Sequence, residues 1–224
     1  MNKFVNIFLL LLVFPALFLS IFVGFDLKIE MLRIDAEDIP YLTEIYAGFA
    51  FIILFIGGKR ALNRWTGVRM LSKIDSFGWN YEVNSIRKKQ VTLYLLIEGL
   101  IQILIAFAFL FLTIKSLPII FVMIILGFDH FIFCLFGNVK SIWRLGITNK
   151  AIVLGDREFK IIYFSGLRKV TVQQQTIFFE YIKDLQLSIS LESIKEENRA
   201  SFKAFLDDKL DRDKVFFSQD FKGF

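Results

Sequence analysis

The sequence has almost none of the side chains that nucleophilic, redox or metal chemistry uses. Its 224 residues include one cysteine, Cys134, and one histidine, His130. A disulfide framework or a zinc site needs several such residues at defined spacing, so neither is expected here. The glycine-rich motifs GxGxxG and GxxxxGK[ST] and the nucleophile motif GxSxG are also absent from the sequence. We therefore expect no cofactor, no bound metal and no enzymatic activity.

Apolar residues, by contrast, are abundant and gathered in long blocks. They make up 55% of the chain, which contains 28 phenylalanines. A helix of about 20 residues spans the roughly 30 Å hydrocarbon core of a bilayer, and four blocks approach that length. The predicted transmembrane helices cover residues 4–25, 41–57, 91–113 and 118–137. The sequence thus predicts a transmembrane helical domain over 1–137 and, over 138–224, a small extramembrane domain of mixed composition.

The charges of the loops predict how these helices are oriented. Segment 58–90 carries eight Lys or Arg residues against two acidic ones, whereas segment 26–40 carries five acidic residues against two basic ones. Loops rich in Lys and Arg stay on the cytoplasmic side of a membrane. We therefore expect 58–90 to be cytoplasmic and, with an even number of crossings, both chain termini to be cytoplasmic as well.

The cytoplasmic loop 58–90 also carries residues suited to the membrane surface. Apolar residues recur at helical spacing in its first half, which is typical of an amphipathic helix at the interface, and 76–80 reads as a turn. The predicted lipid-interface residues are Arg60, Arg64, Trp65, Arg87, Lys88 and Lys89. The alternative is that these charges merely flank the helices. Since they adjoin the membrane helices, nucleic acid is not an expected partner.

Four polar residues interrupt the third and fourth apolar blocks: Glu98, Gln102, Asp129 and His130. Counted outward from the turn at 115–118, Gln102 and Asp129 fall at about the same depth, and Glu98 lies one helical turn further in. Polar side chains are costly in lipid and therefore face protein or a water-filled cavity. We expect these four residues to form one cluster within the membrane.

Three interpretations of this cluster stay open. Hydrogen bonds between Gln102 and Asp129, or between Glu98 and His130, would join the helices, each with about 0.6–2 kcal/mol. Alternatively, the carboxylates and the histidine would relay protons or ions. The third interpretation is metal or thiol chemistry involving Cys134, one helical turn from His130, although no HxxxH or ExxH spacing supports it.

The chain beyond Gly137 has the pattern of short strands followed by a helix. Apolar and β-branched residues predict strands at 151–154, 159–164, 169–175, 177–182 and 185–191. Ser193 and Glu196 have the spacing of a capping box, which predicts a helix over about 194–211. We therefore expect a small antiparallel β domain capped by one C-terminal helix.

The segments ITNKAIVL at 147–154 and FSGLRKVTVQQQTIFFEYIKDLQLSIS at 164–190, with the amphipathic helix after them, resemble bacterial pleckstrin-homology-like domains that lie next to membrane helices. The resemblance covers about residues 144–212. It implies a small curved β-sandwich or barrel that is capped by the helix and serves interaction or assembly. It carries over no phosphoinositide-binding residues.

These observations together predict a non-enzymatic, multi-pass protein of the bacterial inner (cytoplasmic) membrane. Its PH-like domain is expected to bind a protein partner, or to act as an accessory or assembly subunit of a membrane complex. The expected partners are membrane lipids and a second protein or a further copy of this chain. One alternative is a small proton- or ion-conducting protein built on Glu98, Asp129 and His130. Another is lipid sensing by Arg87, Lys88 and Lys89 together with the amphipathic segment of the loop 58–90.

Overall fold

The computed structural model describes residues 2–29, 34–35, 39–73, 76–182 and 185–223. Parts of the expected outer loop, residues 30–33 and 36–38, lie outside the described residues. The chain forms two compact units. Unit 1 contains the residues up to Leu62 together with Leu95–Phe133, and unit 2 contains Asn63–Tyr94 and Cys134–Phe224.

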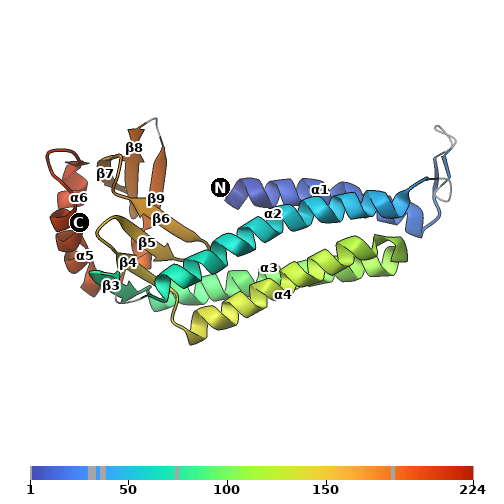
Figure 1. Ribbon diagram of the computed structural model, residues 1–224, viewed down its shortest axis with the longest axis horizontal. Coiled ribbons are helices and arrows are strands. Elements are labelled where there is room, and N and C mark those ends of the chain that lie inside the picture. The colour runs from blue at the N-terminus through green and yellow to red at the C-terminus, as the bar shows by residue number, and fades with distance from the viewer. Residues whose placement is uncertain (1, 30–33, 36–38, 74–75, 183–184, 224) are drawn as a thin grey trace. The chain divides into compact units, whose positions relative to one another are not determined.

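The elements follow one another as four long helices, then mostly strands, then two short helices (Figure 1). In chain order they are α1 (Asn2–Gly24), β1 (Lys28–Ile29), β2 (Ile34–Asp35), α2 (Leu42–Leu71), β3 (Trp79–Glu82), α3 (Ser85–Leu112), η3 (Ile114–Ser116), α4 (Leu117–Val139), β4 (Arg144–Ile147), β5 (Ala151–Gly155), β6 (Phe159–Tyr163), β7 (Leu167–Gln173), β8 (Thr176–Tyr181), β9 (Gln186–Ser190), η5 (Leu191–Ser193), α5 (Glu196–Lys209), β10 (Phe216–Phe217) and α6 (Gln219–Gly223).

Helices α1 to α4 are each long and apolar enough, by length and composition, to cross a membrane. Two of them, α2 and α3, are longer than the predicted apolar blocks by a full helical turn or more. Helix α2 continues to Leu71, so the expected amphipathic segment is part of it, and α3 begins at Ser85. The reason is that hydropathy changes where charged residues begin, whereas backbone hydrogen bonding continues through them until a residue breaks the helix.

The core of unit 1 lies between the four helices and is almost entirely aliphatic and aromatic. Tyr46, Phe109 and Ile119 are fully buried, and Ser20 of α1 forms a hydrogen bond of 2.9 Å with the Tyr46 hydroxyl of α2. Glycine allows α1 to approach α3, because a Cβ atom at Gly24 would lie only 2.3 Å from a backbone oxygen of α3. Such small residues are common where membrane helices pack closely.

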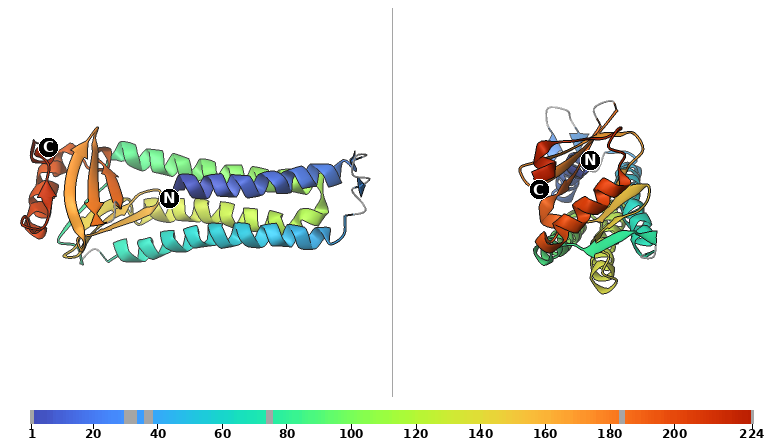
Figure 2. Two further views of the ribbon diagram at one scale, coloured as in Figure 1. Left: turned by 90° about the horizontal axis from the view of Figure 1, so that it is seen from above. Right: turned by 90° about the vertical axis from the view of Figure 1, so that its left-hand side faces the viewer.

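Unit 2 contains two four-stranded sheets with the orders β3-β4-β5-β6 and β10-β7-β8-β9. All neighbouring strands are antiparallel except β10, which runs parallel to β7. Helices α5 and α6 lie together beside the strands (Figure 2). Ile152, Ile177 and Phe179 of the sheets and Phe202 of α5 are fully buried, which places the core between the sheets and the helix. The expected antiparallel sheet with a C-terminal helix is thus present.

Strand β3 was not predicted from the sequence pattern. It pairs with β4 from Trp79↔Ile147 to Glu82↔Arg144. Residues 76–80 had been expected to form a turn. The segment that joins α2 to α3 therefore supplies an edge strand of a sheet, and residues 63–94 belong to the same unit as the C-terminal strands. The boundary expected after Gly137 does not separate the two units, because two separate stretches of chain build unit 2.

The predicted capping box at Ser193 does not form. Ser190 accepts a hydrogen bond from the backbone N–H of Glu192 and starts the short 3-10 turn η5, in which Ser193 is buried. Helix α5 then begins at Glu196, and its cap residue Lys195 makes no side-chain capping bond. Strands β4 and β10 and the helix α6 had not been predicted either.

Candidate functional site

Polar side chains from three helices of unit 1 meet at one place: Arg60 of α2, Glu98 of α3 and His130 of α4. Glu98 lies 14 residues from the end of α3 at Leu112, and His130 lies 13 residues from the start of α4 at Leu117. At a rise of about 1.5 Å per residue, both lie roughly 20 Å from those helix ends. Each residue thus sits well inside the apolar part of its helix.

Close packing of α3 against α4 brings Glu98 and His130 together. A Cβ atom at Gly99 would lie 3.0 Å from the backbone oxygen of Gly127, and one at Gly127 would lie 3.1 Å from the backbone oxygen of Gly99. The two glycines therefore let the helix backbones touch, as small residues do in membrane helix pairs. Gly99 follows Glu98 directly, and Gly127 lies one turn before His130.

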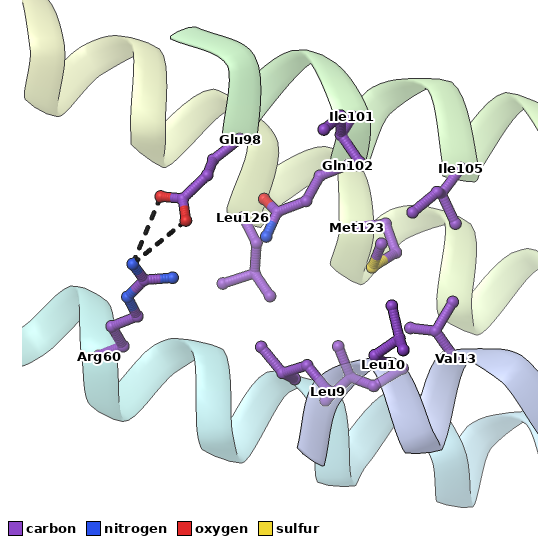
Figure 3. A pocket seen from close by; sticks show the side chains of 11 residues that line it. Leu9, Leu10, Val13, Arg60, Glu98, Ile101, Gln102, Ile105, Met123 and Leu126 are labelled. Carbon is purple, nitrogen blue, oxygen red and sulfur yellow. Dashed lines mark hydrogen bonds and ion pairs between the residues drawn. The ribbon is translucent and has the colours of Figure 1, made fainter. Parts of the chain in front are cut away.

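The guanidinium group of Arg60 contacts the carboxylate of Glu98. One terminal nitrogen of Arg60 lies 3.3 Å from Oε2 and 3.5 Å from Oε1 (Figure 3). The Arg60 side chain is 9% exposed and the Glu98 side chain 19% exposed. Charge-assisted bonds between nitrogen and carboxylate oxygen are usually about 2.7–2.9 Å long. Arg60 and Glu98 therefore form an ion pair whose contacts are longer than those of a close bidentate arginine–carboxylate pair.

The two nitrogens of the His130 imidazole ring have different neighbours: one contacts a backbone oxygen and the other lies near the carboxylate of Glu98. Nδ1 lies 2.7 Å from the backbone oxygen of Leu126, one turn earlier in α4. Nε2 lies 3.5 Å from Oε2 of Glu98, and the His130 side chain is 3% exposed. Of the two pairs named from the sequence, Glu98 with His130 is the one that the structure places in contact.

Arg60 and Glu98 line a cavity of about 180 Å³, and His130 is not among its lining residues. Its other walls are apolar except for Gln102, one turn from Glu98, whose side chain points into the same space (Figure 3). The lining residues are Leu9, Leu10, Val13, Ile53, Arg60, Glu98, Ile101, Gln102, Ile105, Met123 and Leu126. The buried Oε1 of Gln102 has no hydrogen-bond partner among the described residues.

Asp129 does not line this cavity, although it had been expected in the cluster. It is half-buried and adjacent to His130, and successive residues of a helix point about 100° apart. No hydrogen bond between Asp129 and Gln102 occurs in the part of the chain that the structure describes. Arg60 takes part in the site instead. Its role follows from the length of α2, which hydropathy alone does not show.

The predicted lipid-interface residues have different surroundings in the structure. Arg64 is 2% exposed, so its side chain is not presented at the surface. In unit 2, Trp65 packs edge-on against Phe136 with ring centres 5.6 Å apart. Arg87 donates to Asp156 Oδ2 at 2.6 Å. Arg60 takes part in the ion pair described above. Of the six residues only Lys89 is exposed, and Lys88 is half-buried.

Unit 2 has a surface groove of about 510 Å³ between α5 and the C-terminal segment that contains β10 and α6. Its lining residues are Lys203, Asp207, Arg212, Val215, Phe216, Phe217 and Phe221. Phe216 is 62% exposed, whereas Phe217 and Phe221 are buried and pack on each other with ring centres 5.2 Å apart. Arg212 pairs with Asp207 at 3.0 Å. The groove therefore combines an exposed aromatic ring with charges of both signs.

Within the described residues no group of three or more His, Cys, Asp or Glu side chains could hold a metal ion. Cys134 lies in unit 2, where its sulfur is 3.9 Å from the backbone oxygen of Thr92. The arrangement around Glu98 brings together a guanidinium group, a carboxylate and an imidazole ring. No family model, curated protein or solved structure matches the chain.

Proposed function

We propose that this chain is a non-enzymatic, integral protein of a bacterial cytoplasmic membrane, in which unit 2 is a cytoplasmic binding module. The support is of two kinds. Four helices are long and apolar enough to span a bilayer, and the basic residues gather where α2 ends and α3 begins, in a stretch that largely belongs to unit 2. By the positive-inside rule, unit 2 and both termini face the cytoplasm.

The construction of unit 2 is the observation that carries this proposal. The cytoplasmic ends of α2, α3 and α4 belong to the same compact unit as the two sheets. Strand β3 follows α2 in the chain, pairs with β4, and is followed by α3. The indole N–H of the buried Trp143 donates to Asn138 at the end of α4, at 3.3 Å. Unit 2 is thus built from the strands together with the ends of three of the long helices.

The PH-like identity of this module is also a proposal. Its support is the run of antiparallel strands β4 to β9 followed by α5, which is the order on which the resemblance in the sequence rests. The resemblance implies a role in interaction or assembly. No phosphate ligand is required by that role, in agreement with an aromatic rather than a basic groove.

The groove between α5 and β10 is the partner site that we propose. Its volume falls in the range of about 300–1,000 Å³ typical of binding pockets. Aromatic residues dominate the energetics of protein interfaces, and Phe216 is exposed at this place. A segment with an apolar side chain flanked by an acidic group would fill the groove and face Lys203 and Arg212.

The test is purification of the tagged full-length protein in mild detergent, with Phe216→Ala compared to Tyr163→Ala. Tyr163 is a matched control because it is also an exposed aromatic residue, at 56%, on a strand outside the groove. We expect one protein, or a second copy of this chain, to be recovered in fixed ratio with the wild type and Tyr163→Ala but not with Phe216→Ala. Repeated recovery of a monomer alone, or equal loss with both variants, would contradict the proposal.

Conduction of protons or ions is a second candidate function, which the contact among Arg60, Glu98 and His130 favours. Charged side chains inside apolar helices commonly mark ion or proton pathways. Flux into proteoliposomes measures it directly, with Glu98→Gln and Asp129→Asn as variants. If the wild type shows no flux above empty vesicles, or if Glu98→Gln leaves the flux unchanged, this function is excluded.

A further inference from the structure

We propose that Glu98 and His130 form a binding site for a single proton, which is held on Nε2 of His130 against the carboxylate of Glu98. The site needs neither a flux of ions nor a partner protein, so it stands apart from both functions proposed above. Three contacts of the described residues lead to it: those of the two imidazole nitrogens and that of the Arg60 guanidinium group.

The contact at Nδ1 decides which nitrogen of the neutral ring carries hydrogen. A backbone carbonyl oxygen only accepts hydrogen bonds, and the oxygen of Leu126 lies 2.7 Å from Nδ1. Nδ1 must therefore be the donor. A neutral imidazole has one N–H group, so Nε2 then carries a lone pair.

The contact at Nε2 is favourable only when a proton is present. Oε2 of Glu98 lies 3.5 Å from Nε2, and an ionised carboxylate only accepts hydrogen bonds. A neutral ring would place two acceptors face to face, in surroundings where the His130 side chain is only 3% exposed to solvent. One proton between them turns this arrangement into an attractive pair.

Arg60 determines which of the two groups holds that proton. Its guanidinium nitrogen lies 3.3 Å from the same Oε2 atom and stays charged in proteins. A positive charge at this distance favours the ionised carboxylate, so the proton belongs on Nε2. The site with its proton contains two positive groups and one negative group.

Other charged groups near the site are few. Helix α1 contributes Leu9, Leu10 and Val13 to the cavity, none of which titrates. Helices α2 and α3 contribute Arg60 and Glu98 as their charged cavity residues. On α4 the ionisable residues besides His130 are Asp129 and Cys134, and neither lines the cavity. The carboxylate next to Nε2 is that of Glu98, so Asp129, the adjacent carboxylate in the chain, is the internal control for the identity of the partner.

His130 is the only histidine of the chain, so its ring nitrogens can be observed without assignment. The experiment is nitrogen NMR of the full-length protein, labelled with ¹⁵N-histidine, in lipid nanodiscs between pH 5 and 9. We expect the neutral ring to carry its hydrogen on Nδ1 and to convert to imidazolium as the pH falls. A neutral ring with hydrogen on Nε2 would overturn the proposal on the wild type alone.

Two variants identify the partner of the ring. Glu98→Gln removes the negative charge, and at a pH where wild-type His130 is half imidazolium we expect the ratio of imidazolium to neutral ring to fall roughly tenfold or more. Asp129→Asn should leave that ratio within about twofold of the wild type. An unchanged titration in Glu98→Gln, or an equal effect of Asp129→Asn, would overturn the proposal.

Discussion

The ion pair between Arg87 and Asp156 tests whether Arg87 is a structural residue of unit 2 or a lipid contact. A terminal nitrogen of Arg87, near the start of α3, lies 2.6 Å from Oδ2 of Asp156, after β5. The Arg87 side chain is 26% exposed and that of Asp156 is 9% exposed. The other carboxylate oxygen accepts the backbone N–H of Arg157 at 2.8 Å. The carboxylate thus links the turn after β5 to the helix.

The expected size of the effect follows from this partial burial. Fully exposed ion pairs are worth about 0.2–1 kcal/mol, whereas hydrogen bonds to charged groups contribute about 1.5–3 kcal/mol. Because Asp156 is buried and Arg87 is partly exposed, we expect Arg87→Ala to lower the free energy of unfolding by about 1.5–2.5 kcal/mol. The Arg157 N–H remains bound to Asp156, which limits the penalty. The double mutant with Asp156→Ala should reveal a coupling energy of about 1–2 kcal/mol.

Tryptophan fluorescence during denaturation in detergent micelles measures this quantity, because Trp65, Trp79 and Trp143, the three tryptophans of the chain, all belong to unit 2. Lys88→Ala is the matched control. It removes the neighbouring positive charge of the same helix, and we expect a change within about 0.5 kcal/mol.

Two outcomes would refute the reasoning. One is a coupling energy below about 0.5 kcal/mol between Arg87 and Asp156, which is the range of independent sites. The other is a stability effect of Arg87→Ala that appears only with anionic lipid present. That result would favour headgroup binding by Arg87, because a pair within unit 2 does not depend on lipid charge.

Two further predictions concern unit 2. Gly137→Ala should destabilise it by about 1–3 kcal/mol in the same denaturation assay, because a Cβ atom would overlap the fully buried ring of Trp143. Burial raises the pKa of Tyr181, so its neutral form stabilises the fold below the ordinary tyrosine pKa of about 10. This stability is lost as the pH rises through the folded-state pKa, and Tyr181→Phe should therefore weaken the fall of stability that denaturation measures above pH 10.

The elements that sequence patterns predicted are those whose signal is local. Hydropathy located all four long helices, since an apolar run long enough to span a bilayer is visible in any short window. The alternation at Leu187 and Ile189 likewise located β9. The signal of strand β3 is too short to stand out. Trp79 and Tyr81 alternate with Asn80 and Glu82 over only four residues, and the strand pairs with β4, which lies beyond two long helices in the chain.

The candidate site was predictable in the same uneven way. Glu98 and His130 stood out because they are polar residues in apolar runs, and helix lengths place them at similar depth. Arg60 did not, because it lies beyond the apolar run in which α2 begins, and a basic residue at that point usually flanks a membrane helix. Only the continuation of α2 past that run, together with its packing against α3, brings Arg60 to Glu98.

Packing by glycine, and not attraction between the polar groups, accounts for the position of this site. Hydrogen bonds between membrane helices contribute on average only about 0.6 kcal/mol, too little to hold α3 and α4 at a distance that their other side chains oppose. The contact between Gly99 and Gly127 sets that distance, and a Cβ atom at Gly99 would also come within 3.2 Å of the His130 Cβ atom. Placing Arg60, Glu98 and His130 in this interface costs desolvation free energy, which agrees with the proton-binding role proposed above.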